Sequence, residues 1–226
     1  MAAYRSAGSQ HVETKAERHP LRDKLSTGST PCDDVCVTPE TRASFAQHVQ
    51  EIVLALPSEQ SHGIRERMGS VWDEIANAPK VAWLTAKTYD ILSDSVRAQL
   101  GDTGTVELYR KVGRRLLANP VFQRFVETAL RIFGVSPHAV LKIIPRGRDS
   151  VVRHSGTVVY EKVDAHCARL RLSDYPASTF SKGATVLLLS GAFLGVLDAA
   201  NAGEGAKVET SDVDIQRGCA TFTLTW

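Results

Sequence analysis

Apolar side chains recur at every third or fourth position from residue 38 to residue 144, which is the spacing of one face of a helix. Thr38 and Pro39 predict where the first helix begins, because threonine caps helices and proline fits their first turn. Gly101–Gly104 predicts a turn within the series. We therefore expect about six successive helices, at residues 38–56, 64–75, 79–100, 106–116, 121–133 and 137–144, the last ending before Pro145.

The apolar spacing then changes to every second position, which is typical of strands. Residues 156–163 and 168–172 predict one hairpin, and residues 206–211 and 220–226 predict a second. A long apolar helix is expected between the hairpins, from about residue 178 to residue 201. The fold class predicted is α+β, with N-terminal helices packed on one antiparallel sheet of about four strands and the apolar helix between two hairpins.

Residues 1–37 carry no periodic apolar set and mix basic, acidic and small polar side chains. Such a segment buries too little surface to offset the entropy of ordering it, so we expect a disordered tail. Residues 38–226 are expected to form a single domain. The chain shows no apolar signal region and no stretch long enough to cross a bilayer, so we expect a cytoplasmic protein with reduced cysteines and no membrane insertion.

The overall charge argues against nucleic acid as the default partner. The 226 residues have a formal net charge of +2 and a sequence pI near 8.4, with 23% charged and 43% hydrophobic residues. Proteins whose affinity rests on phosphate contacts carry a larger basic excess. Composition alone therefore describes a globular domain without assigning its function.

Four stretches carry a resemblance to a known family. They are Leu108–Arg115 followed by Asn119-Pro120, Leu170–Leu172 with Tyr175-Pro176, Leu189–Leu197, and Phe222–Trp226. In their order and in the terminal aromatic strand, they resemble a family of uncharacterised domains that is expanded as paralogues in the myxobacteria. That family is distantly similar to the 4-vinyl-reductase domain, the heme-NO-binding domain and the Bet3-like fold of Golgi transport particles. The resemblance covers about residues 40–226.

The resemblance implies a ligand-binding or regulatory domain, often dimeric, whose helices and sheet enclose an apolar pocket. Heme-NO-binding domains use an axial histidine and a Tyr-x-Ser-x-Arg clamp for the heme propionates. Here Tyr109 is followed by Arg110, Lys111, Val112 and Gly113, so the clamp motif is missing. No cofactor is therefore expected.

Aromatic and glycine residues supply the candidates for a ligand pocket, since such sites are mainly apolar. The candidates are Tyr109, Gly113, Phe122, Phe125, Phe133, Gly191 and Phe193. The alternative is that the aromatic side chains are ordinary core. For Gly191 and Gly195 the alternative is a close contact between helices, which the absence of a Cβ allows.

Basic residues at helical spacing suggest a site for an anion or an acidic partner. The candidates are Arg110, Arg114 and Arg115, and a second basic group lies at Arg146, Arg148 and Arg153. The alternative is a solvated helix face whose charges are balanced elsewhere in the chain.

No catalytic or metal-binding constellation is evident. Cys32 and Cys36 lack a second pair of ligands, and the adjacent His166 and Cys167 point to opposite faces of a strand. Ser190 lacks the Gly-x-Ser-x-Gly pattern of a nucleophile elbow. We therefore expect neither a metal site nor an enzyme.

Two functions remain open. The first is a non-enzymatic small-molecule-sensing or regulatory domain, which binds an apolar molecule between the helices of residues 106–133 and the helix of residues 184–200. The ligand would then act on a homodimer or on a protein partner. The alternative is a structural adaptor, a protein-interaction module with a filled interior and no ligand.

Overall fold

The computed structural model describes residues 38–118, 136–177 and 183–226, in which helices and strands are interspersed along the chain. The helices are α1 (Ala43–Leu54), α2 (Ser58–Met68), α3 (Ser70–Asn77), α4 (Ala86–Ala118), α6 (Pro137–Arg148) and α8 (Ala184–Ala199). The strands are β1 (Glu40–Arg42), β2 (Trp83–Thr85), β3 (Val152–Arg153), β4 (Thr157–Lys162), β5 (Cys167–Ser173), β6 (Lys207–Asp214) and β7 (Cys219–Thr225). The predicted α+β class is confirmed.

The larger sheet has the order β4-β5-β7-β6, and all neighbouring strands are antiparallel. It joins two hairpins, β4-β5 and β6-β7, through the pairing of Leu170 with Phe222 and of its neighbours in register. Helix α8 connects the hairpins. The sheet of four strands and the helix between its hairpins were both predicted from the change in apolar spacing.

One face of this sheet is buried under α6 and α8. Alternate residues of β5 and β7 point inward: Ala168, Leu170, Leu172, Ala220, Phe222 and Leu224. They pack against Val140 and Leu141 of α6 and against Phe193, Val196 and Leu197 of α8. The rings of Phe193 and Phe222 meet edge to face, with centroids 5.2 Å apart. This is the C-terminal core cluster.

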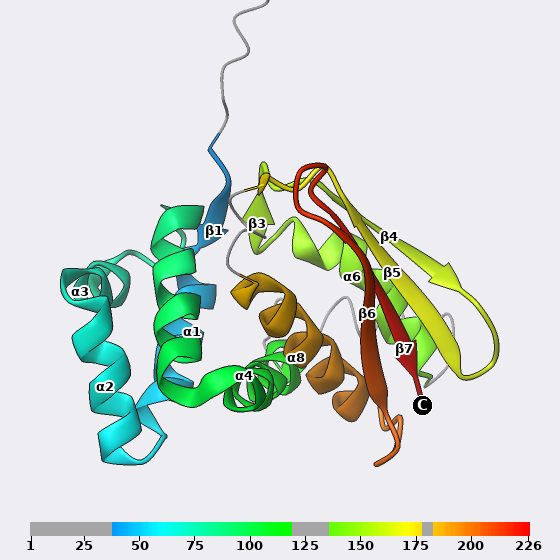
Figure 1. The fold of residues 1–226 in the computed structure, drawn as a ribbon, viewed down its shortest axis with the longest axis horizontal. Helices are drawn as coiled ribbons and strands as arrows, with labels where there is room; N and C mark the ends of the chain where they lie inside the picture. Colours follow the sequence, from blue (N-terminus) through cyan, green and yellow to red (C-terminus); the bar gives the residue numbers. More distant parts are fainter. Residues whose placement is uncertain (1–37, 119–135, 178–182) are drawn as a thin grey trace, which may run out of the picture. The chain divides into compact units, whose positions relative to one another are not determined.

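Helices α1 to α4 enclose a second group of buried side chains, the N-terminal core cluster. Its fully buried members include Val49 of α1, Ile64 of α2, Ile75 of α3, and Leu92 and Tyr109 of α4. Figure 1 shows α8 between these helices and the sheet, so α8 contributes to both clusters: Leu188 belongs to the first and Phe193 to the second.

The start of the domain differs from the prediction. Residues 40–42 form strand β1, and the first helix begins only at Ala43. Residues 83–85, expected to be helical, form strand β2. A small sheet of order β2-β1-β3 results. The guanidinium groups of Arg42 and Arg153 both lie over the ring of Trp83, at 3.9 Å and 4.4 Å from its centroid. Pairing between distant segments overrides the local helix signal here.

Further helix boundaries differ. In place of the one helix predicted at residues 64–75, α2 and α3 meet at Gly69. Helix α6 begins as predicted, with Ser136 accepting the backbone N–H of Ala139, but it continues through Pro145 to Arg148. Helices 86–100 and 102–118 are joined into α4, which breaks its helical geometry at Gly101, where φ is +70°. The helix predicted at residues 121–133, the first residues of the apolar helix, and the tail of residues 1–37 lie outside the described residues.

No helix in the described part of the chain is both long enough and apolar enough to span a membrane.

Candidate functional site

Helices α4 and α8 touch backbone to backbone at three glycines. A Cβ at Gly113 would lie 2.2 Å from the carbonyl oxygen of Ala192, and one at Gly191 would lie 2.4 Å from that of Val106. At Gly195 the distance to the carbonyl oxygen of Arg110 would be 2.1 Å. No ligand fits between the two helices at these three glycines.

One carboxylate also links these two helices through hydrogen bonds. Asp198 of α8 accepts hydrogen bonds from Arg110 Nε and Arg114 Nε, both at 2.6 Å, and from Arg110 Nη2 at 2.8 Å. The hydrogen bonds from Arg110 and Arg114 lower the pKa of Asp198 against the opposing effect of burial. Arg110 and Arg114 are therefore engaged within the fold.

An apolar cavity of about 190 Å³ lies where the two core clusters meet. Phe45 and Tyr89 of the N-terminal cluster form part of its wall, as do Leu172, Phe193 and Val196 of the C-terminal cluster. Side chains from α1, α4, α6, α8, β4 and β5 thus surround one space. A molecule bound there would contact both clusters at once.

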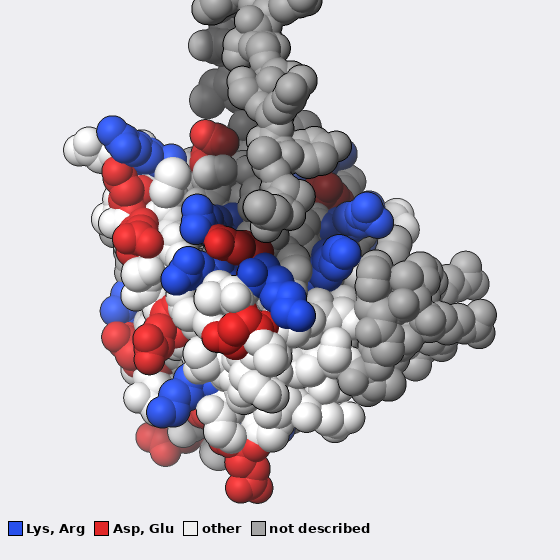
Figure 2. Space-filling model, turned by 90° about the vertical axis from the view of Figure 1, so that its right-hand side faces the viewer, with Lys and Arg blue, Asp and Glu red and all other residues white. Residues whose placement is uncertain are grey.

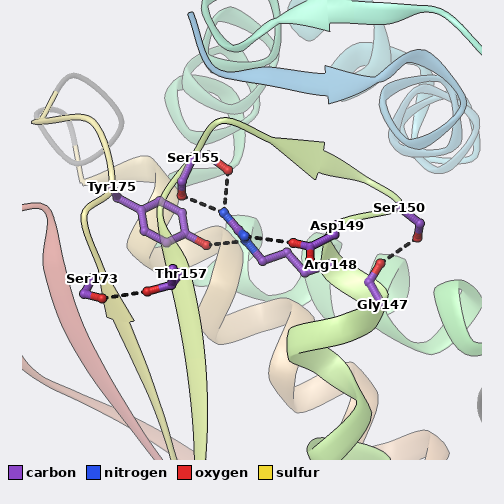
Figure 3. A network of polar contacts seen from close by, with 8 residues as sticks. All are labelled: Gly147, Arg148, Asp149, Ser150, Ser155, Thr157, Ser173 and Tyr175. Carbon is purple, nitrogen blue, oxygen red and sulfur yellow. Dashed lines mark hydrogen bonds and ion pairs between the residues drawn. The ribbon is translucent and has the colours of Figure 1, made fainter. Parts of the chain in front are cut away.

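Arg148 stands at the wall of this cavity, and a network of polar groups holds its side chain (Figure 3). Nη2 donates to the carbonyl oxygen and to the Oγ of Ser155, both at 2.6 Å, and Nε donates to the Tyr175 hydroxyl at 2.9 Å. Nη1 lies 3.1 Å from Asp149. Burial raises the pKa of Tyr175, so its hydroxyl stays protonated. The network ties the end of α6 to the segments before β4 and after β5.

We expect Arg148→Lys to lower the free energy of unfolding by about 1–2 kcal/mol, because lysine keeps the charge but loses the planar fork that reaches three partners. Urea unfolding followed by circular dichroism measures the change. Arg146→Lys, at an exposed position of the same helix, is the matched control. Equal effects at the two positions would show that the network does not stabilise the fold.

A second cavity, of about 420 Å³, adjoins the first and carries positive charge. Its described wall includes Arg42, Lys80 and Arg115 but no aspartate or glutamate, and Ser44 and Ser150 contribute further polar groups. Lys80 and Arg115 form no ion pair within the described residues. Arg42 donates from Nη1 to the carbonyl oxygen of Val81 at 2.6 Å. We call this the cationic cavity.

His48 also contributes to the wall of the cationic cavity. Its Nδ1 lies 3.4 Å from the carboxylate of Glu51. Its Nε2 is buried and has no hydrogen-bond partner in the part of the chain that the structure describes. That nitrogen is therefore not presented to a molecule in the cavity.

The residues predicted to line a pocket fall into different places. Phe193 lines the apolar cavity. Tyr109 is fully buried in the N-terminal core cluster, with its hydroxyl 3.0 Å from Ser93 Oγ, and Gly113 and Gly191 lie in the α4–α8 contact. Phe122, Phe125 and Phe133 lie outside the described residues. A role in ligand binding remains a prediction for all of them.

The basic residues predicted to bind an anion or an acidic partner also lie in different places. Arg110 and Arg114 bind Asp198, whereas Arg115 reaches the cationic cavity. Figure 2 shows basic and acidic side chains interspersed on the side where the four-stranded sheet lies. On that sheet, Glu161 pairs with Arg171 at 2.8 Å and with Arg169 at 4.0 Å. Mixed charges of this kind do not form a phosphate-binding surface.

The cavity linings include residues that sequence reasoning missed. The sequence places Phe45 on a helix face and Leu172 in a strand without predicting a role in a site for either, and it predicts no role for Lys80. These residues come together only in the folded structure, because the lining residues are distributed along the sequence from Pro39 to Val196. No local sequence pattern identifies them. The described ranges contain no group of three or more histidine, cysteine, aspartate or glutamate residues that could hold a metal ion.

Comparison with known proteins identifies the fold. No protein-family model and no curated protein matches the chain. Among solved structures, the Fe(II) unliganded H-NOX protein from K. algicida is 11% identical, with a TM-score of 0.56 over 81% of this chain and 95% of that one. An H-NOX protein solved to probe heme distortion is 12% identical, with a TM-score of 0.55 over 81% and 92% of the two chains. The described domain therefore has the fold of the H-NOX proteins.

Proposed function

We propose that residues 38–226 form a non-enzymatic small-molecule-sensing or regulatory domain that takes an apolar ligand in the apolar cavity. The observation that carries this proposal is the position of the cavity between the two core clusters. A ligand that fits one arrangement of the clusters better than another shifts the population toward it. Pockets of this kind are mainly apolar with a few polar groups, as here at Arg148 and Ser155.

Heme is the ligand that the fold family suggests, since the neighbours include an Fe(II) protein and one solved to probe heme distortion. Heme iron is held by histidine, cysteine, methionine or tyrosine. The apolar cavity has no histidine, cysteine or methionine among its described lining residues. Residues 119–135 contain none of these three residue types either.

Two tyrosines remain as possible iron ligands, and neither fits. Tyr89 and Tyr175 line the cavity, but burial raises the pKa of both hydroxyls and so opposes the phenolate that binds iron. The Tyr175 hydroxyl also accepts the hydrogen bond from Arg148. The described lining of the cavity thus supplies no histidine, cysteine or methionine for heme iron, and the proposed ligand is an apolar molecule other than heme.

Three further expectations from the sequence belong to this proposal. Membership of the myxobacterial paralogue family, a homodimer or protein partner, and a cytoplasmic location stay predictions, and all three accord with a regulatory domain. The adaptor function requires a filled interior, so the same experiment distinguishes it from the sensor.

We expect native mass spectrometry of the purified full-length protein to show a bound small molecule that denaturation releases. The absorption spectrum of the same sample is expected to show no heme band. Ala192→Phe places a ring at the wall of the apolar cavity and should abolish retention of the molecule, whereas Ala199→Phe, exposed on the same helix, should not. A native mass equal to that of the polypeptide alone, together with no binding of an added apolar probe, would favour the adaptor function.

A further inference from the structure

The apolar and cationic cavities share part of their walls. Phe45, Leu116 and Val151 line both. One cavity is lined mainly by apolar side chains, and the other by three cationic side chains without a described carboxylate. We propose that the ligand is an anionic amphiphile, with its head group at Arg42, Lys80 and Arg115 and its apolar tail in the apolar cavity. The placement of the tail rests on the proposed function, whereas the placement of the head rests on the cationic cavity.

The charges of the cationic cavity come from three separate parts of the fold. Arg42 ends β1, Lys80 precedes β2, and Arg115 lies in the last turn of α4. The fold thus brings together like charges that repel one another when no anion is present. An anionic head group between them relieves this repulsion. The Arg115 guanidinium offers the paired N–H donors that recognise carboxylate or phosphate, while Arg42, which donates from Nη1 to the carbonyl oxygen of Val81, adds its charge.

The alternative position for the head group is Arg148, at the wall of the apolar cavity. Its guanidinium already donates to Ser155 and Tyr175 and lies beside Asp149. An anion bound there would have to displace these partners. Glu40 and Asp90 also line the apolar cavity and would repel it, so the cationic cavity is the better site for the head.

The volume of the apolar cavity limits the tail. A volume of about 190 Å³ is several times what a single water molecule needs, so the cavity has room for a short alkyl chain. We choose a tail of about eight carbons for the test. Octyl phosphate and octanoate are therefore suitable probes, with phosphate and carboxylate as the two sources of the same anionic chemistry.

The test is isothermal titration calorimetry of the full-length protein, in a buffer free of other phosphates. It measures the affinities for octyl phosphate, octanoate, octanol and inorganic phosphate. We expect octyl phosphate to bind at least about tenfold more tightly than octanol and than inorganic phosphate, because each of these two uses only one of the cavities. The ratio of octyl phosphate to octanoate affinity then identifies the preferred head group.

Variants assign the head group to its site. Lys80→Glu with Arg115→Glu should weaken octyl phosphate binding by about tenfold or more and leave octanol binding within about twofold. Lys162→Glu with Lys207→Glu, both exposed on the sheet, changes the net charge equally and should alter neither affinity.

Each failure has a distinct meaning. Equal binding of octanol and octyl phosphate, unchanged by the double charge reversal, would overturn the anionic amphiphile but leave the apolar-ligand function standing. Inorganic phosphate binding as tightly as octyl phosphate would also overturn it, because the tail would then make no contribution. Binding of none of the four probes would count against both the amphiphile and the proposed function.

Discussion

Replacing Gly195 by leucine should lower the free energy of unfolding by about 3 kcal/mol, the upper end of the usual range for overpacking. A Cβ at this position lies 2.1 Å from the carbonyl oxygen of Arg110, 2.7 Å from the backbone nitrogen of Arg114 and 2.9 Å from the Cα of Gly113. All three atoms belong to the backbone of α4, so no side chain can rotate away. The helices must separate, and urea unfolding measures the cost.

Gly205→Leu is the control for this prediction. Nothing lies within 4 Å of a Cβ built at Gly205, and its φ is not in the left-handed region. Its effect should therefore be limited to a few tenths of a kcal/mol. If Gly195→Leu and Gly205→Leu destabilised the protein equally, the close contact of α4 and α8 would not contribute to stability.

The sheet and the helix between its hairpins could be predicted because their signals are local. Alternation at Leu170 and Leu172, and again at Phe222 and Leu224, predicts both the strands and the face that is buried. The glycines of α8 likewise predict a close contact between helices, and the structure has one at Gly191 and Gly195. For these elements, residues that are close together in the sequence carry enough information to predict the structure.

The small sheet and the cavities could not be predicted because they depend on distant pairings. Glu40 pairs with Thr85 on one side and with Arg153 on the other, and no local pattern marks residues 40–42 as a strand. The network of Arg148, Ser155 and Tyr175 likewise spans three segments and forms no linear motif. Lys80 and Arg115 have charges that the sequence shows, but only the fold places them at one cavity.

The distribution of arginine partners separates two kinds of basic residue that look alike in sequence. Helix α4 carries three of these arginines within six residues. Arg110 and Arg114 share the carboxylate of Asp198, whereas Arg115 lines the cationic cavity. A structural ion pair and a candidate ligand site thus lie within two turns of one helix. This division predicts that substitutions at Asp198 alter stability, whereas substitutions at Arg115 alter binding.

Asp198→Asn should lower the free energy of unfolding at pH 7 by about 2–3 kcal/mol, between the values for exposed and buried ion pairs. The side chain of Asp198 is 14% exposed, and it is the carboxylate on which both Arg110 and Arg114 converge. The asparagine amide accepts fewer hydrogen bonds and carries no charge. Asp73→Asn, at an exposed position of α3, is the control and should change stability little.

The pH dependence gives this prediction a second, independent readout. Because Arg110 and Arg114 lower the pKa of Asp198 in the folded protein, the unfolded chain takes up a proton at a higher pH than the folded one does. The stabilisation is therefore complete above the usual aspartate pKa of about 3.9 and is lost as the pH falls through the lower pKa of the folded state. The difference between wild type and Asp198→Asn in urea unfolding should narrow steadily below about pH 4. A difference that stayed constant down to the acid limit of folding would mean that the charge of Asp198 does not hold α8 against α4.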